Sequence, residues 1–236
     1  MTPRTLTEAE VASFIAGGTG DEYRLRSLGF TPDVIYDIGA DVGSMTLFAH
    51  GLWPEARIVA VEPFGPSYER LLRHVEGIPQ ITAIHAAIGK SPLWEPLVTT
   101  EQVPGFALHW LVVDVDSPIR RAWSSVGWVP SSVPAVTLSD LYAQYGGQQF
   151  IVKTDCEGAE TAIMDDPAST EIVRQSAYFA CELHGWNIGL GACPWGQATL
   201  GARMMAWLFD LANDRTMDCW IGGACIHAWS KRKDVT

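Results

Sequence analysis

Hydrophobic positions along this chain fall into short runs that alternate with longer amphipathic stretches. The short runs are rich in Val, Ile and Ala, which is typical of β-strands, and the longer stretches carry apolar residues at helical spacing. The predicted strands are 34–38, 57–61, 80–88, 150–154 and 177–183, and the predicted helices are 44–50, 66–75, 137–145 and 200–213. Asp218–Ile221 and Cys225–Trp229 are predicted to form a closing β-hairpin. For 236 residues, this pattern predicts one α/β domain.

The first predicted strand ends in a glycine turn. Its run from Val34 to Ile38 includes Asp37 and breaks at Gly39, and a helix-compatible segment begins just past Gly43. In open α/β sheets such a turn lies at the carboxyl edge of the strands, where ligands bind against helix-start amides. We therefore expect a ligand at this turn.

Charges in the turn select the kind of ligand. A dinucleotide-binding turn has three glycines in the spacing Gly-x-Gly-x-x-Gly, whereas here Asp41 lies between Gly39 and Gly43. A carboxylate about 4 Å from a phosphate repels it by about 4 kcal/mol at an effective dielectric constant of about 20. A ligand that carries an ammonium and a sulfonium but no phosphate suits Asp37 and Asp41. S-adenosylmethionine (SAM) is such a ligand.

An acid also ends the second predicted strand. The hydrophobic run from Arg57 to Val61 is followed by Glu62 and Pro63. An acid at this strand tip can accept hydrogen bonds from both ribose hydroxyls of an adenosine. Because NAD and SAM share this geometry, Glu62 indicates adenosine and Asp41 argues against a pyrophosphate. An ordinary βαβ unit with an acid at a strand end is the alternative interpretation.

Three segments together resemble the FkbM-type SAM-dependent methyltransferases. Residues 31–43, which include Asp-Ile-Gly-Ala-Asp-Val-Gly, are similar to the first motif of that family, and Val61-Glu62-Pro63 is similar to the second. Residues 133–141, followed by Ile-Val-Lys-Thr-Asp-Cys-Glu-Gly-Ala-Glu at 151–160, are similar to the family's Lys-x-Asp-x-Glu-Gly-x-Glu strand end.

The resemblance implies a fold, a cofactor and the residues that bind it. The fold is a Rossmann-like class I methyltransferase: α/β, with a mostly parallel seven-stranded sheet, an antiparallel C-terminal hairpin and an insertion between strands 3 and 4. The cofactor is SAM. Its binding residues are expected to be Asp37, Gly39, Ala40, Asp41, Gly43, Glu62, Pro63 and His85. His85 lies where the family holds the adenine ring, and a surface histidine at a strand end is the alternative.

Candidates for catalysis lie at the ends of the fourth and fifth predicted strands. Asp155, with Lys153, Glu182 and His184 as further candidates, is expected to position or deprotonate the methyl acceptor. An Asp, Glu and His set can bind a divalent metal or act as a base with an orienting partner, and the sequence does not choose between these roles. The resemblance implies a hydroxyl on a sugar or natural product as the acceptor, and a nitrogen on a peptide or amine is the alternative.

Three positions depart from the family pattern. Asp41 replaces the more usual Asn and adds negative charge beside the cofactor. Thr154 and Cys156 replace the usual aliphatic residues around Asp155 and make this strand end more polar. These changes affect the polarity of the site rather than the fold.

Other segments are expected to surround the sheet. Within the single domain at 1–236, residues 1–30 are expected to form a helical cap. Residues 90–147 form the insertion, with hairpin-like strands at 93–99 and 106–115, and could serve as a substrate wall or as the edge of a homo-oligomer. Lys231 to Lys233 are expected to form a solvated tail.

Composition narrows the class of protein. Hydrophobic residues make up 47% of the chain and the mean hydropathy is +0.08, as in a packed globular domain. A net charge of −11 and a pI near 4.9 disfavour nucleic acid and anionic membranes as partners. Five cysteines without a Cys-x-x-Cys pair indicate reduced thiols. With neither a signal-like apolar start nor a long apolar run, a cytoplasmic protein that acts on a small molecule is expected.

Two other classes compete with a methyltransferase. A non-catalytic binding protein would keep the fold and use the pocket or the Trp-rich insertion to hold a partner, but the intact glycine turn and acids argue against it. A NAD-dependent dehydrogenase is disfavoured by Asp41 and by the missing third glycine.

Overall fold

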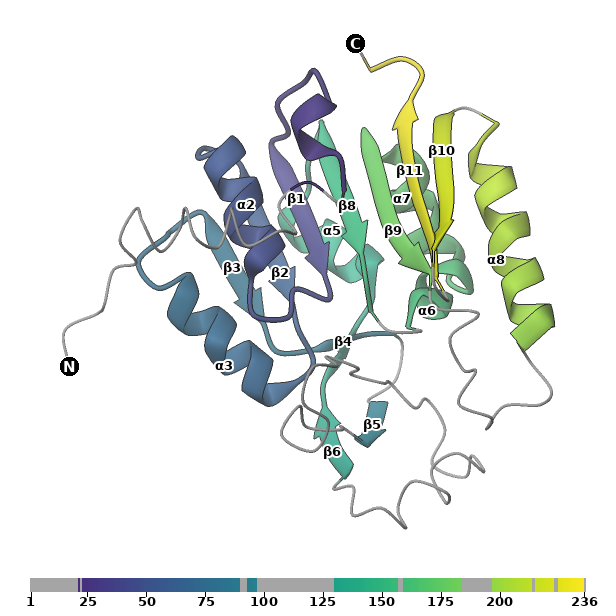
Figure 1. Cartoon of the computed structure of the whole chain (residues 1–236). Helices are drawn as coiled ribbons and strands as arrows, with labels where there is room; N and C mark the ends of the chain where they lie inside the picture. Colours follow the sequence, from purple (N-terminus) through teal and green to yellow (C-terminus); the bar gives the residue numbers. More distant parts are fainter. Residues whose placement is uncertain are drawn as a thin grey trace.

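A computed structural model gives the architecture of the chain (Figure 1). It describes residues 21, 23–89, 93–96, 130–156, 159–183, 197–213, 215–222 and 225–235. The predicted helix before residue 21, most of the predicted insertion and His184 lie outside these residues.

Seven strands form one sheet. They are β1 (Val34–Ile38), β2 (Arg57–Val61), β3 (Ile81–Ile84), β8 (Phe150–Thr154), β9 (Tyr178–Leu183), β10 (Arg215–Gly222) and β11 (Cys225–Arg232). Their order across the sheet is β10-β11-β9-β8-β1-β2-β3. Neighbouring strands are parallel except that β11 runs antiparallel to both β9 and β10. The structure therefore confirms the predicted class I methyltransferase fold, a mostly parallel sheet with an antiparallel C-terminal hairpin.

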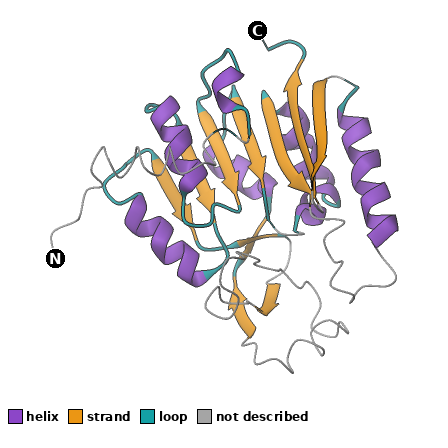
Figure 2. Ribbon diagram, viewed as in Figure 1, coloured by secondary structure: helices purple, strands orange, loops and turns teal. Residues whose placement is uncertain are grey.

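Helices cover both faces of this sheet and make three layers (Figure 2). One face is covered by the 3₁₀ helix η1 (Leu25–Ser27), α2 (Ser44–Leu52) and α3 (Gly65–His74). The other face is covered by α5 (Leu138–Tyr145), α6 (Glu160–Met164), α7 (Pro167–Gln175) and α8 (Gln197–Leu211). Because β1 and β8 are buried on both faces, their sequences are nearly continuous apolar runs, and their polar residues Asp37, Lys153 and Thr154 lie toward the carboxyl ends.

Local sequence explains where α5 begins. Thr137 is its N-cap: the side chain oxygen accepts a hydrogen bond from the Asp140 amide at 3.0 Å, and the Asp140 carboxylate accepts one from the Thr137 amide at 3.2 Å. This reciprocal capping box satisfies amides that the first helical turn leaves without partners. The predicted start of this helix at Thr137 is confirmed.

The third predicted strand, 80–88, is divided in the structure. Here β3 ends at Ile84, and β4 (Ala87–Ile88) instead pairs with β7 (Ala135–Val136). The amide of Ala87 donates to the carbonyl of Pro134 at 2.8 Å, which draws the chain out of the large sheet.

A second strand pair follows within the predicted insertion. In it, β5 (Leu93–Pro96) runs antiparallel to β6 (Pro130–Val133), whereas the expected partner strand at 106–115 lies outside the described residues. Figure 1 shows β4, β5 and β6 beyond the carboxyl ends of the parallel strands. Within the insertion, the described strands β5 and β6 thus lie at the edge of the sheet where a ligand is expected.

The C-terminal hairpin is longer than predicted. Lys231, expected in a solvated tail, belongs to β11, and its ammonium donates to the carbonyl of Leu28 at 3.1 Å. The C-terminal strand thus contacts the segment that precedes β1. Among the described helices, none has the length and apolar character that crossing a membrane requires.

Candidate functional site

The centre of the sheet is a topological switch point between β1 and β8. From β1 the chain proceeds outward to β2 and β3 on one side, and from β8 it proceeds to β9 on the other. Ligands of open α/β sheets bind outside the carboxyl ends of the strands at such a point. Register places Asp37 of β1 directly beside Lys153 of β8 at this position.

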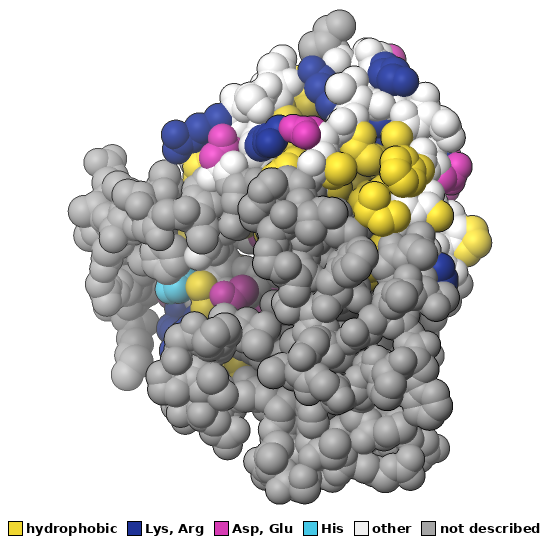
Figure 3. Space-filling model, turned by 45° about the vertical axis from the view of Figure 1, so that its right-hand side comes forward, with side chains coloured by type: hydrophobic (Ala, Val, Ile, Leu, Met, Phe, Trp, Pro, Cys, Tyr) yellow, Lys and Arg dark blue, Asp and Glu magenta, His cyan; other side chains and the backbone are white. Residues whose placement is uncertain are grey.

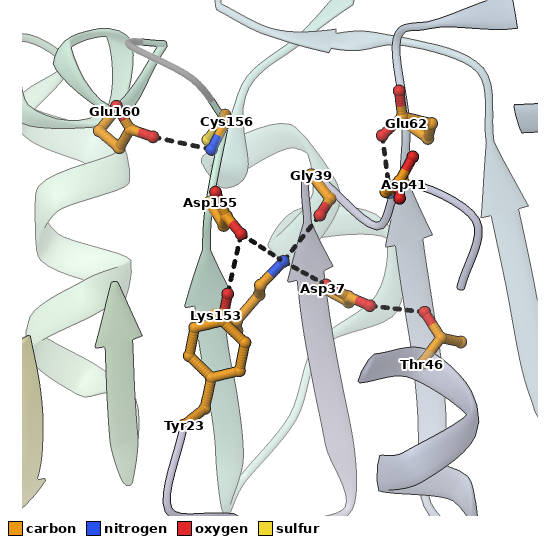
Figure 4. A network of polar contacts seen from close by, with 10 residues as sticks. All are labelled: Tyr23, Asp37, Gly39, Asp41, Thr46, Glu62, Lys153, Asp155, Cys156 and Glu160. Carbon is orange, nitrogen blue, oxygen red and sulfur yellow. Dashed lines mark hydrogen bonds and ion pairs between the residues drawn. The ribbon is translucent and has the colours of Figure 1, made fainter. Parts of the chain in front are cut away.

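Lys153 is the centre of a buried polar network (Figure 4). Its ammonium donates to the Gly39 carbonyl at 2.7 Å, lies 3.1 Å from Asp37 Oδ1 and lies 4.0 Å from Asp155 Oδ2. The side chains of Lys153 and Asp37 are 3% and 0% exposed, whereas that of Asp155 is 28% exposed. Among these three charged groups, Asp155 is therefore the one that solvent or a ligand can reach.

Asp37 acts within the protein interior. Its Oδ2 accepts a hydrogen bond from Thr46 Oγ1 of α2 at 2.5 Å. Its Oδ1 has no hydrogen-bond partner among the described residues, and the ion pair with Lys153 compensates this buried charge. Asp37 was predicted to bind the cofactor, but its carboxylate is buried and faces Lys153 and Thr46.

Lys153 is held in its charged form. Burial lowers the pKa of this ammonium, but the neighbouring carboxylates of Asp37 and Asp155 raise it, and the net direction is upward. Lys153 is therefore a hydrogen-bond donor and a fixed positive charge near neutral pH rather than a proton acceptor.

Tyr23, which the sequence analysis did not single out, contacts this network. Its hydroxyl donates to Asp155 Oδ2 at 2.8 Å, and the Lys153 ammonium lies 5.3 Å from the centre of its ring. No local sequence signal predicts the contact, because Tyr23 and Asp155 are 132 residues apart in the chain. Thr46, the partner of Asp37, was missed for another reason: it lies only nine residues from Asp37 but about one helical turn beyond the motif.

Gly39 is required by the protein backbone. Its φ is +78°, and a Cβ at this position would lie 1.7 Å from the carbonyl oxygen of Asp155. The Asp155 amide donates to the Ile38 carbonyl at 3.0 Å, which brings the end of β8 against the first turn. Gly43 similarly has a φ of +92° and borders Leu71 of α3. Both glycines therefore set how closely neighbouring elements approach the turn.

Glu62 holds the first turn from the tip of β2. Its two carboxyl oxygens accept hydrogen bonds from the amides of Asp41 at 2.8 Å and Phe64 at 2.7 Å. Burial raises the pKa of Glu62 to about 8, although both amide hydrogen bonds act in the opposite direction. Near neutral pH this acid therefore exchanges between protonated and ionised forms. The backbone of Ala40 is tied to the same strand, since its amide donates to Val61 at 3.0 Å.

Asp41 and His85 flank the turn on the side of α3. The Asp41 carboxylate is exposed and accepts a hydrogen bond from Ser67 Oγ at 2.6 Å. His85 Nε2 donates to the carbonyl of Pro63 at 2.9 Å, and its ring stacks on Tyr68 with centroids 4.6 Å apart. The structure thus brings His85 beside the second motif, as an exposed ring.

The remaining candidates lie toward β9. Glu182 is partly buried, and because Ala180 pairs with Lys153, alternation puts Glu182 on the sheet face of Lys153. The amide of Cys156 donates to Glu160 Oε1 at 2.7 Å, and burial, reinforced by nearby acids, raises the pKa of the Cys156 thiol. Burial therefore favours the thiol form of this cysteine over the thiolate.

No metal centre is visible in the described part of the chain, where no group of three or more His, Cys, Asp or Glu side chains is arranged to hold an ion.

Figure 3 shows a hollow in which acidic and histidine side chains are visible. Two cavities of about 720 and 430 Å³ lie elsewhere, the first beside Ile78 and the second beside Asp33 and Arg57. Since Asp33 and Arg57 lie at the starts of β1 and β2, the second cavity is at the sheet edge opposite the switch point.

Comparison with known proteins finds similar solved structures only at low sequence identity. No family model and no curated protein sequence matches it. Among solved structures, it is similar to precorrin-6y C5,15-methyltransferase from Geobacter metallireducens, with 13% identity, 98% of this chain and 94% of that chain covered, and a TM-score of 0.45. It is also similar to Aeropyrum pernix fibrillarin with natively bound SAM, with 12% identity, 86% of this chain and 67% of that chain covered, and a TM-score of 0.45. A third similar structure is an SAH-bound methyltransferase from Podospora anserina, with 11% identity, 98% of this chain and 80% of that chain covered, and a TM-score of 0.45. Membership of the FkbM family stays a prediction.

Proposed function

We propose that this chain is a SAM-dependent methyltransferase. The observation that carries the proposal is the arrangement of Asp37, Glu62 and Asp155, which end three adjacent parallel strands around one glycine turn at the switch point. Asp41 is the exposed acid of this two-glycine turn, and its charge suits a ligand that has cationic groups and no phosphate.

Glu62 and the turn it holds fit the nucleoside part of SAM. In its ionised form the Glu62 carboxylate has about four lone-pair sites, and the amides of Asp41 and Phe64 occupy one on each oxygen. Both ribose hydroxyls can therefore donate to Glu62 without displacing the backbone contacts. The stacked rings of Tyr68 and His85 lie beyond Pro63 and offer an aromatic edge for the adenine.

Residues 39–43 are assigned to the methionine part. Asp41 contributes an exposed negative charge, and Gly39, Ala40 and Gly43 contribute backbone without bulky side chains. Asp37 acts indirectly, because its buried carboxylate fixes Lys153 and, through it, the Gly39 carbonyl.

Asp155 is assigned to the methyl acceptor. When bound, SAM supplies a methyl group on a positively charged sulfur, so the protein needs to orient the acceptor and to accept a proton from a weakly acidic hydroxyl. Asp155 is the solvent-open member of its network and lies opposite the first turn. Lys153 fixes it electrostatically, and Glu182 and His184 stay candidates for orienting the acceptor.

We infer a hydroxyl on a sugar or natural product as the acceptor, in line with the sequence resemblance. Methylation of a peptide or amine nitrogen is the alternative. An assay of methyl transfer distinguishes the two acceptor classes. It uses methyl-labelled SAM with a panel of monosaccharides, phenols, small amines and peptides.

Two measurements test the proposal. Calorimetry with SAM, NAD and ATP is expected to show binding of SAM alone, and tight binding of NAD without SAM would refute the assignment. Asp155→Asn is expected to keep SAM affinity within about twofold and to lower methyl transfer at least about a hundredfold, the usual scale for a lost general base. Transfer at the wild-type rate in this variant would remove Asp155 from the mechanism. Binding of SAM without transfer to any acceptor would favour a non-catalytic binding protein.

A further inference from the structure

One oxygen of Asp155 has both a hydrogen-bond donor and a positive charge near it. The Tyr23 hydroxyl donates to Oδ2 at 2.8 Å, and the Lys153 ammonium lies 4.0 Å from the same atom (Figure 4). Tyr23 is only 5% exposed, so water competes little for its hydroxyl. A carboxylate held through one oxygen in this way has its plane fixed, and the direction of its other oxygen is fixed with it.

The backbone of Tyr23 is anchored separately. The Tyr178 hydroxyl of β9 donates to the Tyr23 carbonyl at 2.9 Å. Arg24 forms an ion pair with Asp218 of β10, and its guanidinium lies 4.1 Å from the ring centre of Trp229 on β11. Together with the Lys231 contact to Leu28, these interactions tie residues 23–28 to three strands of the sheet. The sheet itself, rather than a loop alone, therefore sets the position of the Tyr23 hydroxyl.

A buried tyrosine commonly finds a hydrogen-bond partner for purely structural reasons. Here the partner is Asp155, which is 28% exposed and lies at the switch point, while Lys153 and Asp37 are fully enclosed. A hydrogen bond with a purely structural role could be made to any buried acceptor. A hydrogen bond that orients a reacting carboxylate has to be made to a carboxylate that a ligand can reach, as Asp155 is.

We propose that Tyr23 is a positioning residue of the candidate site, which aims the Asp155 carboxylate at the methyl acceptor and is itself held by β9, β10 and β11. This inference rests on the proposed function. It adds a group from outside the sequence motifs, and it assigns a role to the segment that precedes β1.

Tyr23→Phe removes the hydroxyl and keeps the buried ring. We expect SAM affinity to stay within about twofold and kcat for the best acceptor of the panel to fall about tenfold, as for a lost hydrogen bond to a charged group. The acid limb of the pH–rate profile is expected to move to higher pH, because a hydrogen bond donated to a carboxylate favours its ionised form. The other titratable groups near Asp155 are unchanged in this variant; they are Lys153, Asp37, Cys156, Glu160 and Glu182.

The matched control is Tyr145→Phe, which removes a tyrosine hydroxyl that contacts Gln144 instead of the site. It is expected to leave kcat and the pH profile at wild-type values. Tyr178→Phe is a second test variant, since it keeps the Tyr23 side chain and releases its carbonyl. It is expected to move kcat and the profile in the same direction as Tyr23→Phe, by a smaller factor.

A direct readout needs no acceptor. In protein labelled with ¹³C at Asp carboxyls, the Asp155 signal is identified by its loss in Asp155→Asn, and its titration is followed by NMR. A midpoint that rises in Tyr23→Phe but not in Tyr145→Phe supports the inference, and an unmoved midpoint with wild-type kcat overturns it. If the wild-type protein neither binds SAM nor transfers methyl, the proposed function fails, and the NMR titration still decides whether Tyr23 controls Asp155.

Discussion

Removing the charge of Lys153 tests whether the buried network holds the site together. Lys153→Met keeps a long apolar stem and removes the ammonium. Asp37 then stays 0% exposed, with Thr46 as its remaining hydrogen-bond donor among the described residues. We expect the variant to be strongly destabilised, because a buried carboxylate without its cation is far less stable than one in water.

The size of the effect follows from the geometry. At 3.1 Å and an effective dielectric constant of about 20, the attraction between Lys153 and Asp37 is about 5 kcal/mol. Breaking a buried pair by removing one partner typically costs about 3–5 kcal/mol, which is a large share of the usual stability of a domain. The contact with Asp155 adds little, since that side chain is 28% exposed and the separation is 4.0 Å.

Urea denaturation measures this loss. The matched control is Arg203→Met, which breaks an ion pair with Asp165 whose side chains are 53% and 52% exposed, and it should cost less than about 1 kcal/mol. The double variant Asp37→Asn, Lys153→Met is expected to recover most of the loss, because no lone charge is then buried. If Lys153→Met costs no more than Arg203→Met, the buried pair is not what stabilises this part of the sheet.

The pH dependence gives a further check on the same variant. Burial lowers the pKa of Lys153, but the carboxylates of Asp37 and Asp155 raise it by a larger amount, so the pKa in the folded state exceeds that in the unfolded state. The stability that this lysine contributes is then fully present below the unfolded pKa of about 10.4 and is lost only at higher pH. The contribution of Lys153 itself should therefore be constant from about pH 6 to 9. Because a buried carboxylate without its cation is relieved by protonation, the difference between wild type and Lys153→Met should become smaller as the pH falls.

Two other predictions concern the first turn. Gly39→Ala should lower the free energy of unfolding by about 3 kcal/mol or more in thermal unfolding, because the new Cβ would lie 1.7 Å from the Asp155 carbonyl oxygen. The control Gly29→Ala has a similar φ of +72° but nothing within 4 Å of the new Cβ, so it should cost about 1–2 kcal/mol, and equal costs would refute the close approach. Glu62→Gln should remove a pH-dependent loss of stability. The pKa of Glu62 is about 8 in the folded state and 4.5 in the unfolded state, so its contribution to stability is present below about pH 4.5 and is lost as the pH rises to about 8. Across that range, wild type should lose up to about 4 kcal/mol relative to the variant. A flat difference in urea midpoints would show that Glu62 titrates normally.

The ends of the strands were predictable because two simple rules act on them. Apolar runs that stop at an acid or a glycine indicate where β1, β2 and β8 end, and parallel strands align their carboxyl ends at one edge. Asp37, Glu62 and Asp155 were therefore expected on the same edge, and the structure brings them there. The apolar runs predicted the strands one by one, and the family resemblance implied their arrangement in a mostly parallel seven-stranded sheet.

Side-chain partners could not be predicted in the same way. The sequence assigns both Asp37 and Asp41 to the cofactor, but the structure buries Asp37 against Lys153 and leaves Asp41 exposed beside Ser67. Asp37 lies within β1, where strand alternation directs it to the face covered by α2, whereas Asp41 lies in the loop after β1, and a motif does not record this difference. The contact of Tyr23 with Asp155 depends in the same way on chain segments that meet only in the folded sheet.

The buried ion pair itself requires an explanation, because apolar residues of similar volume would fill the same space without desolvating two charges. Lys153 does more than neutralise Asp37: the same ammonium donates to the Gly39 carbonyl and lies near Asp155, so it joins the ends of β1 and β8 across the switch point. An apolar pair would pack there but would make no hydrogen bond to the Gly39 carbonyl and would place no charge near Asp155. The network is therefore better explained as a device that fixes the distance between the first turn and Asp155, the two parts of the site that must hold cofactor and acceptor in line.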